Sequence, residues 1–305
     1  MSRRNPPIHR SSRSRRRRPA RPLLALLVVA AAGISYVVLT GDGLRGAAAP
    51  AVPGEAATPR PAAAIAAPER LRARVIASFP HDPAAYTQGF VWEPDGFLES
   101  AGGYGDSFVR RWRAGDPRPV AEDRLPDHLF GEGIAAVGER VIQLTWREGV
   151  ALYRDRATLR EVERRSYDGE GWGLCYDGER LTMSDGSDTL TLRDPESFTV
   201  LGRIAVRAGA APLANLNELE CAEGWVYANV YGTDDIARID PSSGRVAALI
   251  DASGLLDARE RSAGAEVLNG IAYNPRTETF YLTGKLWPRV FEVVFEPDES
   301  KRSSS

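Results

Sequence analysis

The chain has 305 residues and a formal net charge of −2, but this near-neutral value hides two oppositely charged parts. Residues 1–40 hold nine of the 39 basic side chains and none of the 41 acidic ones, so the rest of the chain carries 30 basic against 41 acidic side chains. An acidic body of this kind argues against nucleic-acid binding, which needs a basic surface.

The N-terminal region has the pattern of a membrane or export segment. Residues 1–22 form a basic tail, and residues 23–39 form an uncharged apolar run of 17 residues, at the short end of what spans a bilayer. The arginines concentrated before this run predict a cytoplasmic tail and a transmembrane signal-anchor over residues 23–40. The C-terminal part is then exported, either periplasmic or held at the inner membrane. A signal peptide cleaved near the small residues 46–49 is the alternative.

The next segment predicts a spacer before a folded domain. Residues 41–70 are rich in Ala and Pro and have few large apolar side chains, so they are expected to form a flexible linker. The folded catalytic domain is expected over residues 71–297, beginning with a strand at 72–79, and residues 298–305 are expected to be a frayed tail. We expect the protein to be a monomer.

The body repeats a short pattern in which a polar or aromatic residue, usually followed by glycine, leads into two β-rich runs. The residues at the head of each repeat are Gln88, Glu132, Trp172, Asn217 and Asn269, at spacings of 40 to 52 residues. This period predicts an all-β fold, a five-bladed β-propeller with about four strands per blade. The head residues should face one mouth of the central channel, and the first strand should complete the last blade. Ordinary hairpins of a β-sandwich are the alternative.

The later repeats contain two cysteines and one segment that breaks the β pattern. Cys175 and Cys221 lie in consecutive repeats, both expected on inner strands, and an exported compartment permits a disulfide. Because adjacent inner strands are expected to lie too far apart for the Cα separation of a disulfide, two buried free thiols are the preferred expectation. Residues 255–265 are charged and break the β pattern, which predicts a short helix or a loop over one face.

Few residue types are available for chemistry in the body. Its histidines are His81 and His128, and no His or Cys spacing is that of a zinc site. A serine-hydrolase elbow, a phosphate-binding loop and a dinucleotide fingerprint are all absent from the sequence. Glu132, set between two glycines, and Lys285, beside a glycine and close to a tryptophan, are the charged candidates. Solvated loop positions are the alternative for both of them.

The order of motifs along the body carries a family resemblance. The motifs include TQG (87–89), FGEG (130–133), GWGL (171–174), NELE (217–220), VLNGIA (267–272) and TGKLWP (283–288). Over about residues 75–295 the chain resembles the plant-type glutaminyl cyclases, which are glutaminyl-peptide cyclotransferases of plants and bacteria. The resemblance implies a five-bladed propeller, peptides or proteins with an N-terminal glutamine as substrates, and no required cofactor. A structural metal ion, calcium or zinc, in the central channel is compatible with it, with no ligands assigned here.

Carried over by position, the resemblance implies an active site at the channel mouth. The matching residues are Gln88, Phe130, Glu132, Trp146, Trp172, Asn217 and Lys285. Two positions depart from the family pattern: Tyr231 stands where the family usually has Trp, and Tyr86 where it usually has Phe. Both keep an aromatic wall and add a hydroxyl group, which we expect to change side-chain preference and rate.

Glu132 is the residue expected to move protons in this site. An apolar surround would raise the pKa of its carboxyl toward the working range, so that it could take a proton from the substrate amine and deliver it to the leaving nitrogen. Lys285 and Asn217 are expected to polarise the substrate carbonyl or hold the oxyanion. The residues expected to position the substrate are Gln88, Phe130, Trp146, Trp172 and Tyr231.

Two other functions fit the same fold. A calcium-dependent lactonase-type propeller would use Glu132, Asn217, Asn269 and Asp185 as oxygen ligands around a channel metal. A non-catalytic exported propeller that binds peptides would keep the aromatic mouth but would have no need for Glu132.

Overall fold

The computed structural model describes residues 66–299. The predicted basic tail, the predicted membrane segment at residues 23–40 and the first part of the linker lie outside these residues, as does the end of the predicted C-terminal tail. Within the described range no helix is long and apolar enough to cross a membrane.

Three consecutive stretches of the chain each form a four-stranded antiparallel sheet. The first contains β2 (Thr87–Glu93), β3 (Gly96–Ala101), β4 (Phe108–Arg113) and β5 (Asp116–Arg124). The second contains β6 (Gly131–Val137), β7 (Arg140–Thr145), β8 (Val150–Asp155) and β9 (Glu161–Ser166). The third contains β10 (Leu174–Tyr176), β11 (Leu181–Met183), β12 (Thr189–Arg193) and β13 (Val200–Ala205).

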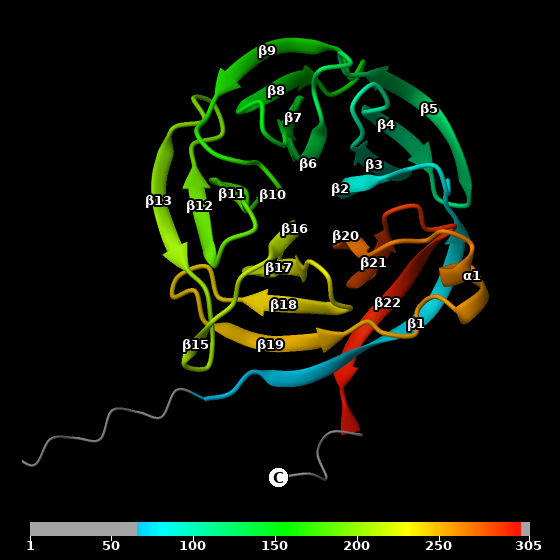
Figure 1. Cartoon of the computed structure of the whole chain (residues 1–305), viewed down its shortest axis with the longest axis vertical. Coiled ribbons are helices and arrows are strands. Elements are labelled where there is room, and N and C mark those ends of the chain that lie inside the picture. Colours follow the sequence, from blue (N-terminus) through cyan, green and yellow to red (C-terminus); the bar gives the residue numbers. More distant parts are fainter. Residues whose placement is uncertain (1–65, 300–305) are drawn as a thin grey trace, which may run out of the picture. The chain divides into compact units, whose positions relative to one another are not determined.

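The remaining long strands join into one eight-stranded sheet in the order β16-β17-β18-β19-β1-β22-β21-β20. Its members are β1 (Glu69–Pro80), β16 (Leu216–Ala222), β17 (Trp225–Val230), β18 (Asp235–Ile239), β19 (Val246–Asp251), β20 (Leu268–Asn274), β21 (Thr279–Gly284) and β22 (Arg289–Pro297). A small hairpin consists of β14 (Arg207–Ala208) and β15 (Ala211–Pro212). The sheets are arranged around a centre, with β2, β6, β10, β16 and β20 innermost (Figure 1). The predicted all-β, propeller-like fold is therefore confirmed.

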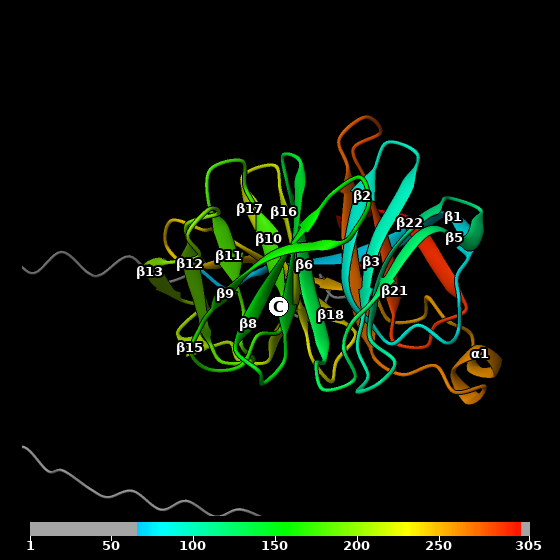
Figure 2. The same ribbon diagram turned by 90° about the horizontal axis from the view of Figure 1, so that it is seen from above.

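The predicted N-terminal strand joins the two ends of the described chain. β1 pairs antiparallel with β22, from Leu71 opposite Pro297 to Pro80 opposite Arg289, and its first residues also pair parallel with β19. The charged segment at residues 255–265 contains the short helix α1 (Ala258–Ser262), whose N-cap is Asp257. Figure 2 shows α1 at the outer edge of the ring. Both features follow the prediction for these segments.

Apolar side chains fill the space between neighbouring sheets. One cluster joins Phe90, Phe97 and Trp112 of the first sheet to Tyr281 and Val290 of β21 and β22. The rings of Phe90 and Phe97 are stacked with their centroids 4.6 Å apart. This packing fixes how each sheet sits against the next, and thereby where the innermost strands begin.

A break in strand pairing occurs where four of the innermost strands begin. The register shifts between Thr87 and Gly89 in β2 and between Gly131 and Ile134 in β6. Equivalent shifts occur in β16, after Leu216, and in β20, after Leu268. Such bulges re-aim a side chain out of the normal alternation of a strand. Four of the predicted head residues therefore lie in bulges.

The glycine after the head residue is required by the closeness of the inner strands. A Cβ added at Gly133 would lie 2.6 Å from the backbone nitrogen of Leu174, and one added at Gly173 would lie 2.1 Å from the backbone oxygen of Asn217. Side chains at these positions would force the strands apart. The recurring glycine is thus explained by packing around the axis.

Glu218 takes the place of this glycine in the fourth repeat. Its buried carboxylate accepts hydrogen bonds from the backbone N–H groups of Phe90, at 3.1 Å, and Ile271, at 2.8 Å. These donors belong to innermost strands of other parts of the ring, β2 and β20. Burial and the nearby Glu220 raise the pKa of the Glu218 carboxyl well above its usual range.

The two cysteines form a disulfide, so the preference for free thiols was wrong. Cys175 in β10 and Cys221 in β16 are bonded, and their Cα atoms are 5.4 Å apart, within the usual range for a disulfide. The expected separation was too large because the close approach of these strands at Gly173 was not foreseen.

Replacing both cysteines with serine should lower the free energy of unfolding by about 4 kcal/mol, the chain-entropy value for a 46-residue separation. The bond acts mainly by restricting the unfolded chain. The difference should appear in denaturant unfolding of the oxidised protein and the double variant. Equal unfolding midpoints and slopes would contradict this expectation.

Candidate active site

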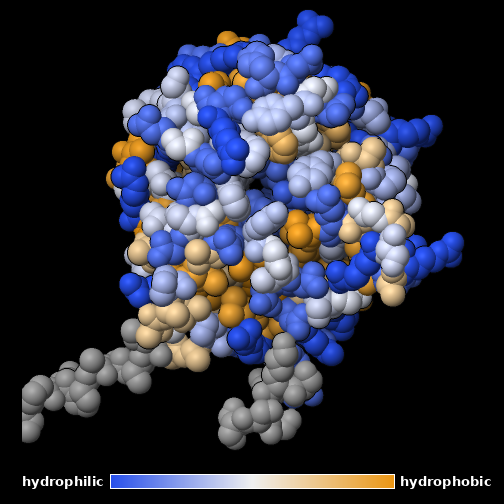
Figure 3. Space-filling view, in the orientation of Figure 1, coloured by the Kyte–Doolittle hydropathy of each residue, from blue (hydrophilic) through white to orange (hydrophobic). Residues whose placement is uncertain are grey.

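The predicted site residues come together around one cavity. A cavity of about 380 Å³ is lined by Tyr86, Gln88, Phe130, Glu132, Trp146, Trp172, Asn217, Tyr231 and Lys285. These nine residues include all eight residues proposed from the sequence for catalysis or substrate binding, together with Tyr86. The face of the described domain seen in Figure 3 is largely hydrophilic and is hollowed near its centre.

Glu132 is a buried carboxyl group at the start of β6, with only 4% of the residue exposed. Its Oε1 accepts a hydrogen bond from Nε2 of Gln88 at 3.0 Å. Burial raises the pKa of the Glu132 carboxyl well above its usual range, and the nearby Glu170 and Glu148 raise it further, whereas Lys285 opposes the shift. A carboxyl group in this setting holds its proton at higher pH than an exposed carboxyl group does.

The Gln88 amide is oriented by a residue behind the cavity. Nδ2 of Asn269 donates to Oε1 of Gln88, at 3.1 Å, and to the backbone oxygen of Thr87, at 2.9 Å. With its oxygen held by Asn269, the Gln88 amide presents its NH₂ group to Glu132. Asn269 is fully buried and does not line the cavity, so the expectation that every head residue faces the mouth was wrong for this one.

Lys285 lies directly after β21, where Leu286 adopts a left-handed φ of 59°. Its Nζ lies 4.6 Å from the ring centre of Tyr86 and 5.4 Å from that of Tyr231. Within residues 66–299 the ammonium group has no carboxylate at ion-pair distance, although the residue is 4% exposed. Burial lowers the pKa of Lys285, and Glu132 opposes this shift. The site therefore holds a cation available to a ligand.

The sequence reasoning missed Glu170, which fixes two of the cavity walls. Its Oε2 accepts hydrogen bonds from the indole Nε1 of Trp146, at 2.8 Å, and of Trp172, at 3.0 Å. Arg147 binds the other carboxylate oxygen at 3.0 Å and lies over the Trp146 ring. The position of Glu170 two residues before Trp172 was the signal available in the sequence. One carboxylate thus orients both tryptophans.

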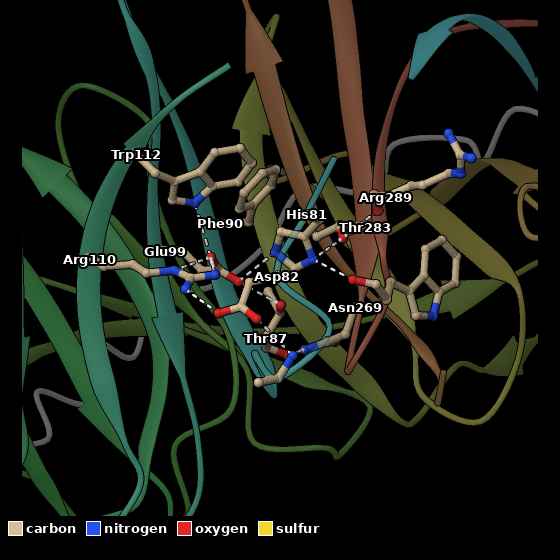
Figure 4. Close-up of polar contacts among 12 residues, drawn as sticks. His81, Asp82, Thr87, Phe90, Glu99, Arg110, Trp112, Asn269, Thr283 and Arg289 are labelled. Atoms are coloured by element: carbon tan, nitrogen blue, oxygen red, sulfur yellow. Dashed lines mark hydrogen bonds and ion pairs between the residues drawn. The ribbon is translucent and has the colours of Figure 1, made fainter. Parts of the chain in front are cut away.

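A buried polar network is centred on Glu99, and Figure 4 shows its side chains. Glu99 Oε1 accepts from Thr87 Oγ1 at 2.7 Å and lies 3.0 Å from His81 Nε2. Its Oε2 accepts from Arg110 Nε at 2.9 Å and Trp112 Nε1 at 3.0 Å. Burial alone would raise the pKa of Glu99, but His81 and Arg110 lower it to about 2.

The same network reaches both sides of the cavity. Nδ1 of His81 donates to the backbone oxygen of Trp287 at 2.7 Å, and Thr87 directly precedes Gln88. Because Trp287 lies two residues after Lys285, the network ties the Lys285 segment to the start of β2. The sequence patterns assign no role to Glu99, so its position was not predicted.

The calcium site of the lactonase alternative is not assembled by the residues proposed for it. Asp185 is exposed and its carboxylate binds Ser187 in its own turn. Asn269 donates to Gln88, as described above. Among residues 66–299 no three His, Cys, Asp or Glu side chains are grouped as metal ligands, and the channel carboxylate of Glu218 binds two backbone N–H groups instead.

Comparisons with known proteins agree with one another. Residues 48–295 match the family model described as glutamine cyclotransferase. A glutaminyl-peptide cyclotransferase of Arabidopsis thaliana is 36% identical over 233 residues, which cover 74% of this chain and 72% of that protein. The crystal structure of Myxococcus xanthus glutaminyl cyclase is 39% identical and matches with a TM-score of 0.71, covering 76% of this chain and 100% of that chain.

Proposed function

The chain belongs to the glutamine cyclotransferase family, and we infer that it converts the N-terminal glutamine of peptides and proteins into pyroglutamate with release of ammonia. This inference rests on the cavity, where the buried Glu132 and Lys285 side chains lie among aromatic side chains. A cavity of about 380 Å³ falls in the size range of small-ligand sites.

The reaction is intramolecular, so the site mainly has to hold one folded-back conformer of the substrate. The α-amine nitrogen attacks the γ-amide carbon, a C–N bond forms, and the original C–N bond breaks to release ammonia. Phe130, Trp146 and Trp172 would pack against the aliphatic part of the substrate glutamine, and Gln88 would hydrogen-bond to one of its polar groups. Tyr231, which is 42% exposed, would cover the outer side.

Glu132 is proposed as the proton shuttle. The attacking amine must lose a proton and the leaving nitrogen must gain one, so a single carboxyl group can serve both steps and finish unchanged. An α-amino group has a pKa of about 7.7–8.0, close to neutral pH. The raised pKa of the buried Glu132 carboxyl supports this role, because it brings acid and amine closer in strength.

Lys285 and Asn217 are proposed to stabilise the oxyanion that forms on the γ-carbonyl. The Lys285 ammonium has no ion-pair partner within the described part of the chain, and the Asn217 side chain lines the same cavity. Charged and amide donors fixed before the reaction stabilise developing negative charge without reorganising.

The architecture is proposed to have five blades. β20, β21 and β22 together with β1 would form the fifth, with β1 as the outer strand, like the four strands of the other sheets. The eight-stranded sheet then arises because the start of β1 also pairs with β19, the outer strand of the preceding blade.

The protein is further proposed to act outside the cytoplasm as a monomer, anchored by residues 23–40, and to need no metal. The Cys175–Cys221 disulfide supports an oxidising compartment.

Ammonia release from a Gln-Ala dipeptide tests the function directly. The purified chain should release ammonia at the same rate with and without a chelator, and should release none when the substrate amine is acetylated. Loss of release with chelator would favour the metal-dependent alternative. No release from any Gln-initiated peptide would leave the peptide-binding module as the better description.

A further inference from the structure

A second cavity of about 530 Å³ adjoins the site. Tyr86 and Phe130 line both cavities, and their rings meet edge to face with centroids 6.4 Å apart. The second cavity is bounded by the turn after β1, the loop between β3 and β4, and the outer strand β5. Three further cavities among residues 66–299 share no residue with the site.

The second cavity carries an excess of negative charge. Asp82, Asp106 and Glu122 line it, together with Arg110 and Arg124. The guanidinium group of Arg110 is already occupied, since it contacts Asp82 at 2.8 Å and the buried Glu99 at 2.9 Å (Figure 4). We refer to this cavity as the acidic groove.

One carboxylate of the acidic groove is free to meet a ligand. Asp106 is exposed, and within residues 66–299 its carboxylate takes part in no hydrogen bond or ion pair. Glu122 lies 3.5 Å from Arg124, whose side chain is 63% exposed, so this pair is loosely held in solvent. Among the residues that line the groove, three carboxylates stand against two guanidinium groups.

The proposed substrate supplies an occupant for the groove. Only the N-terminal glutamine reacts, and its carbonyl continues into the rest of the peptide, which has to leave the active-site cavity past one of its walls. The acidic groove lies directly beyond the wall made by Tyr86 and Phe130. A peptide following that path would place its second and later residues beside Asp106 and Asp82.

We propose that the acidic groove receives the residues that follow the N-terminal glutamine, and that it favours substrates with Lys or Arg there over substrates with Asp or Glu. This inference rests on the proposed cyclotransferase function and adds a substrate class to it. Because the carboxylates are partly exposed, the preference should be moderate and weakened by salt.

Two series of peptides test the proposal. Each peptide begins with Gln and carries one Lys, or one Glu, at position 2, 3, 4 or 5 of an otherwise all-alanine sequence. At one position or more, kcat/KM should be about fivefold higher for the Lys peptide than for the Glu peptide at low salt. The difference should arise in KM, because the groove does not touch the reacting atoms, and it should shrink at 0.5 M salt.

Substitutions of Asp106 test whether the acidic groove causes this preference. Asp106→Asn should reduce the Lys/Glu ratio and Asp106→Lys should abolish or invert it, while both should leave kcat with glutamine amide, which has no residue to place in the groove, unchanged. Glu196→Gln, at an exposed carboxylate in the turn between β12 and β13, is the matched control and should keep the full ratio. A ratio of one at every position, or an unchanged ratio in Asp106→Lys, would overturn the proposal. If Gln-Ala itself is not turned over, the proposed function fails instead.

Discussion

Replacing Glu132 with glutamine should lower kcat by about 10²–10⁴-fold, the usual contribution of a general acid–base group, while the protein stays folded. Glutamine has the same shape and can still accept the hydrogen bond from Gln88 Nε2, but it cannot carry the proton. The raised pKa of Glu132 means that the folded protein disfavours its charged form. The neutral substitute should therefore leave the free energy of unfolding equal or slightly higher.

Ammonia release under saturating Gln-Ala and thermal unfolding are the two measurements. Glu148→Gln is the matched control: it removes a negative charge that also raises the Glu132 pKa, yet leaves the shuttle itself in place. It should change kcat by no more than a few-fold. A Glu132→Gln variant that kept a tenth of the wild-type kcat would contradict the assignment, whatever the control did.

The two departures from the family pattern concern one part of the site. Tyr86 and Tyr231 are the rings that contact the Lys285 ammonium. Burial and a hydrogen bond to Glu266 raise the pKa of Tyr86 to about 12, so its hydroxyl stays neutral at working pH. A tyrosine ring keeps the cation–π contact that a phenylalanine or tryptophan would make. The substitutions therefore preserve the position of the cation and change mainly what surrounds it.

The repeat could be predicted from the sequence because it is local and periodic. The head residue, the following glycine and the two β-rich runs recur at similar spacings, so the innermost strands and most cavity residues follow from one pattern. Asn269 follows the same sequence pattern, but its buried side chain does not line the cavity. The position of its side chain depends on a hydrogen bond to Gln88, the head residue of another repeat. The spacing of the repeats does not reveal that contact.

What the sequence did not predict depends on contacts between distant segments. Glu99 on β3 meets Arg110 and Trp112 of β4 and His81 in the turn after β1, and nothing in its own neighbourhood marks it as a buried anion. The disulfide was missed for a similar reason, because the distance between β10 and β16 depends on how closely Gly173 lets them approach.

Replacing Glu99 with glutamine should lower the free energy of unfolding at pH 7 by about 3–5 kcal/mol, because it leaves the buried guanidinium of Arg110 without its main counter-charge. Denaturant unfolding of both proteins measures the difference. Asp116→Asn is the control, since hydrogen bonds from Arg118 lower the pKa of that carboxyl to about 2 as well, but the pair is solvent-exposed. Its removal should leave the unfolding midpoint nearly unchanged.

The pH dependence of the free energy of unfolding provides a second test of the stabilisation by the Glu99 carboxylate. The folded pKa of Glu99, about 2, lies below the unfolded value of about 4.3, so its charged form stabilises the folded state above that unfolded value. This stabilisation, about 3 kcal/mol for a shift of that size, is lost as the pH falls from about 4.3 toward 2. Other carboxylates contribute to acid unfolding, so the informative quantity is the difference between wild type and Glu99→Gln. That difference should shrink as the pH falls below about 5. A difference independent of pH from 5 down to 2.5 would show that the variant acts by packing alone.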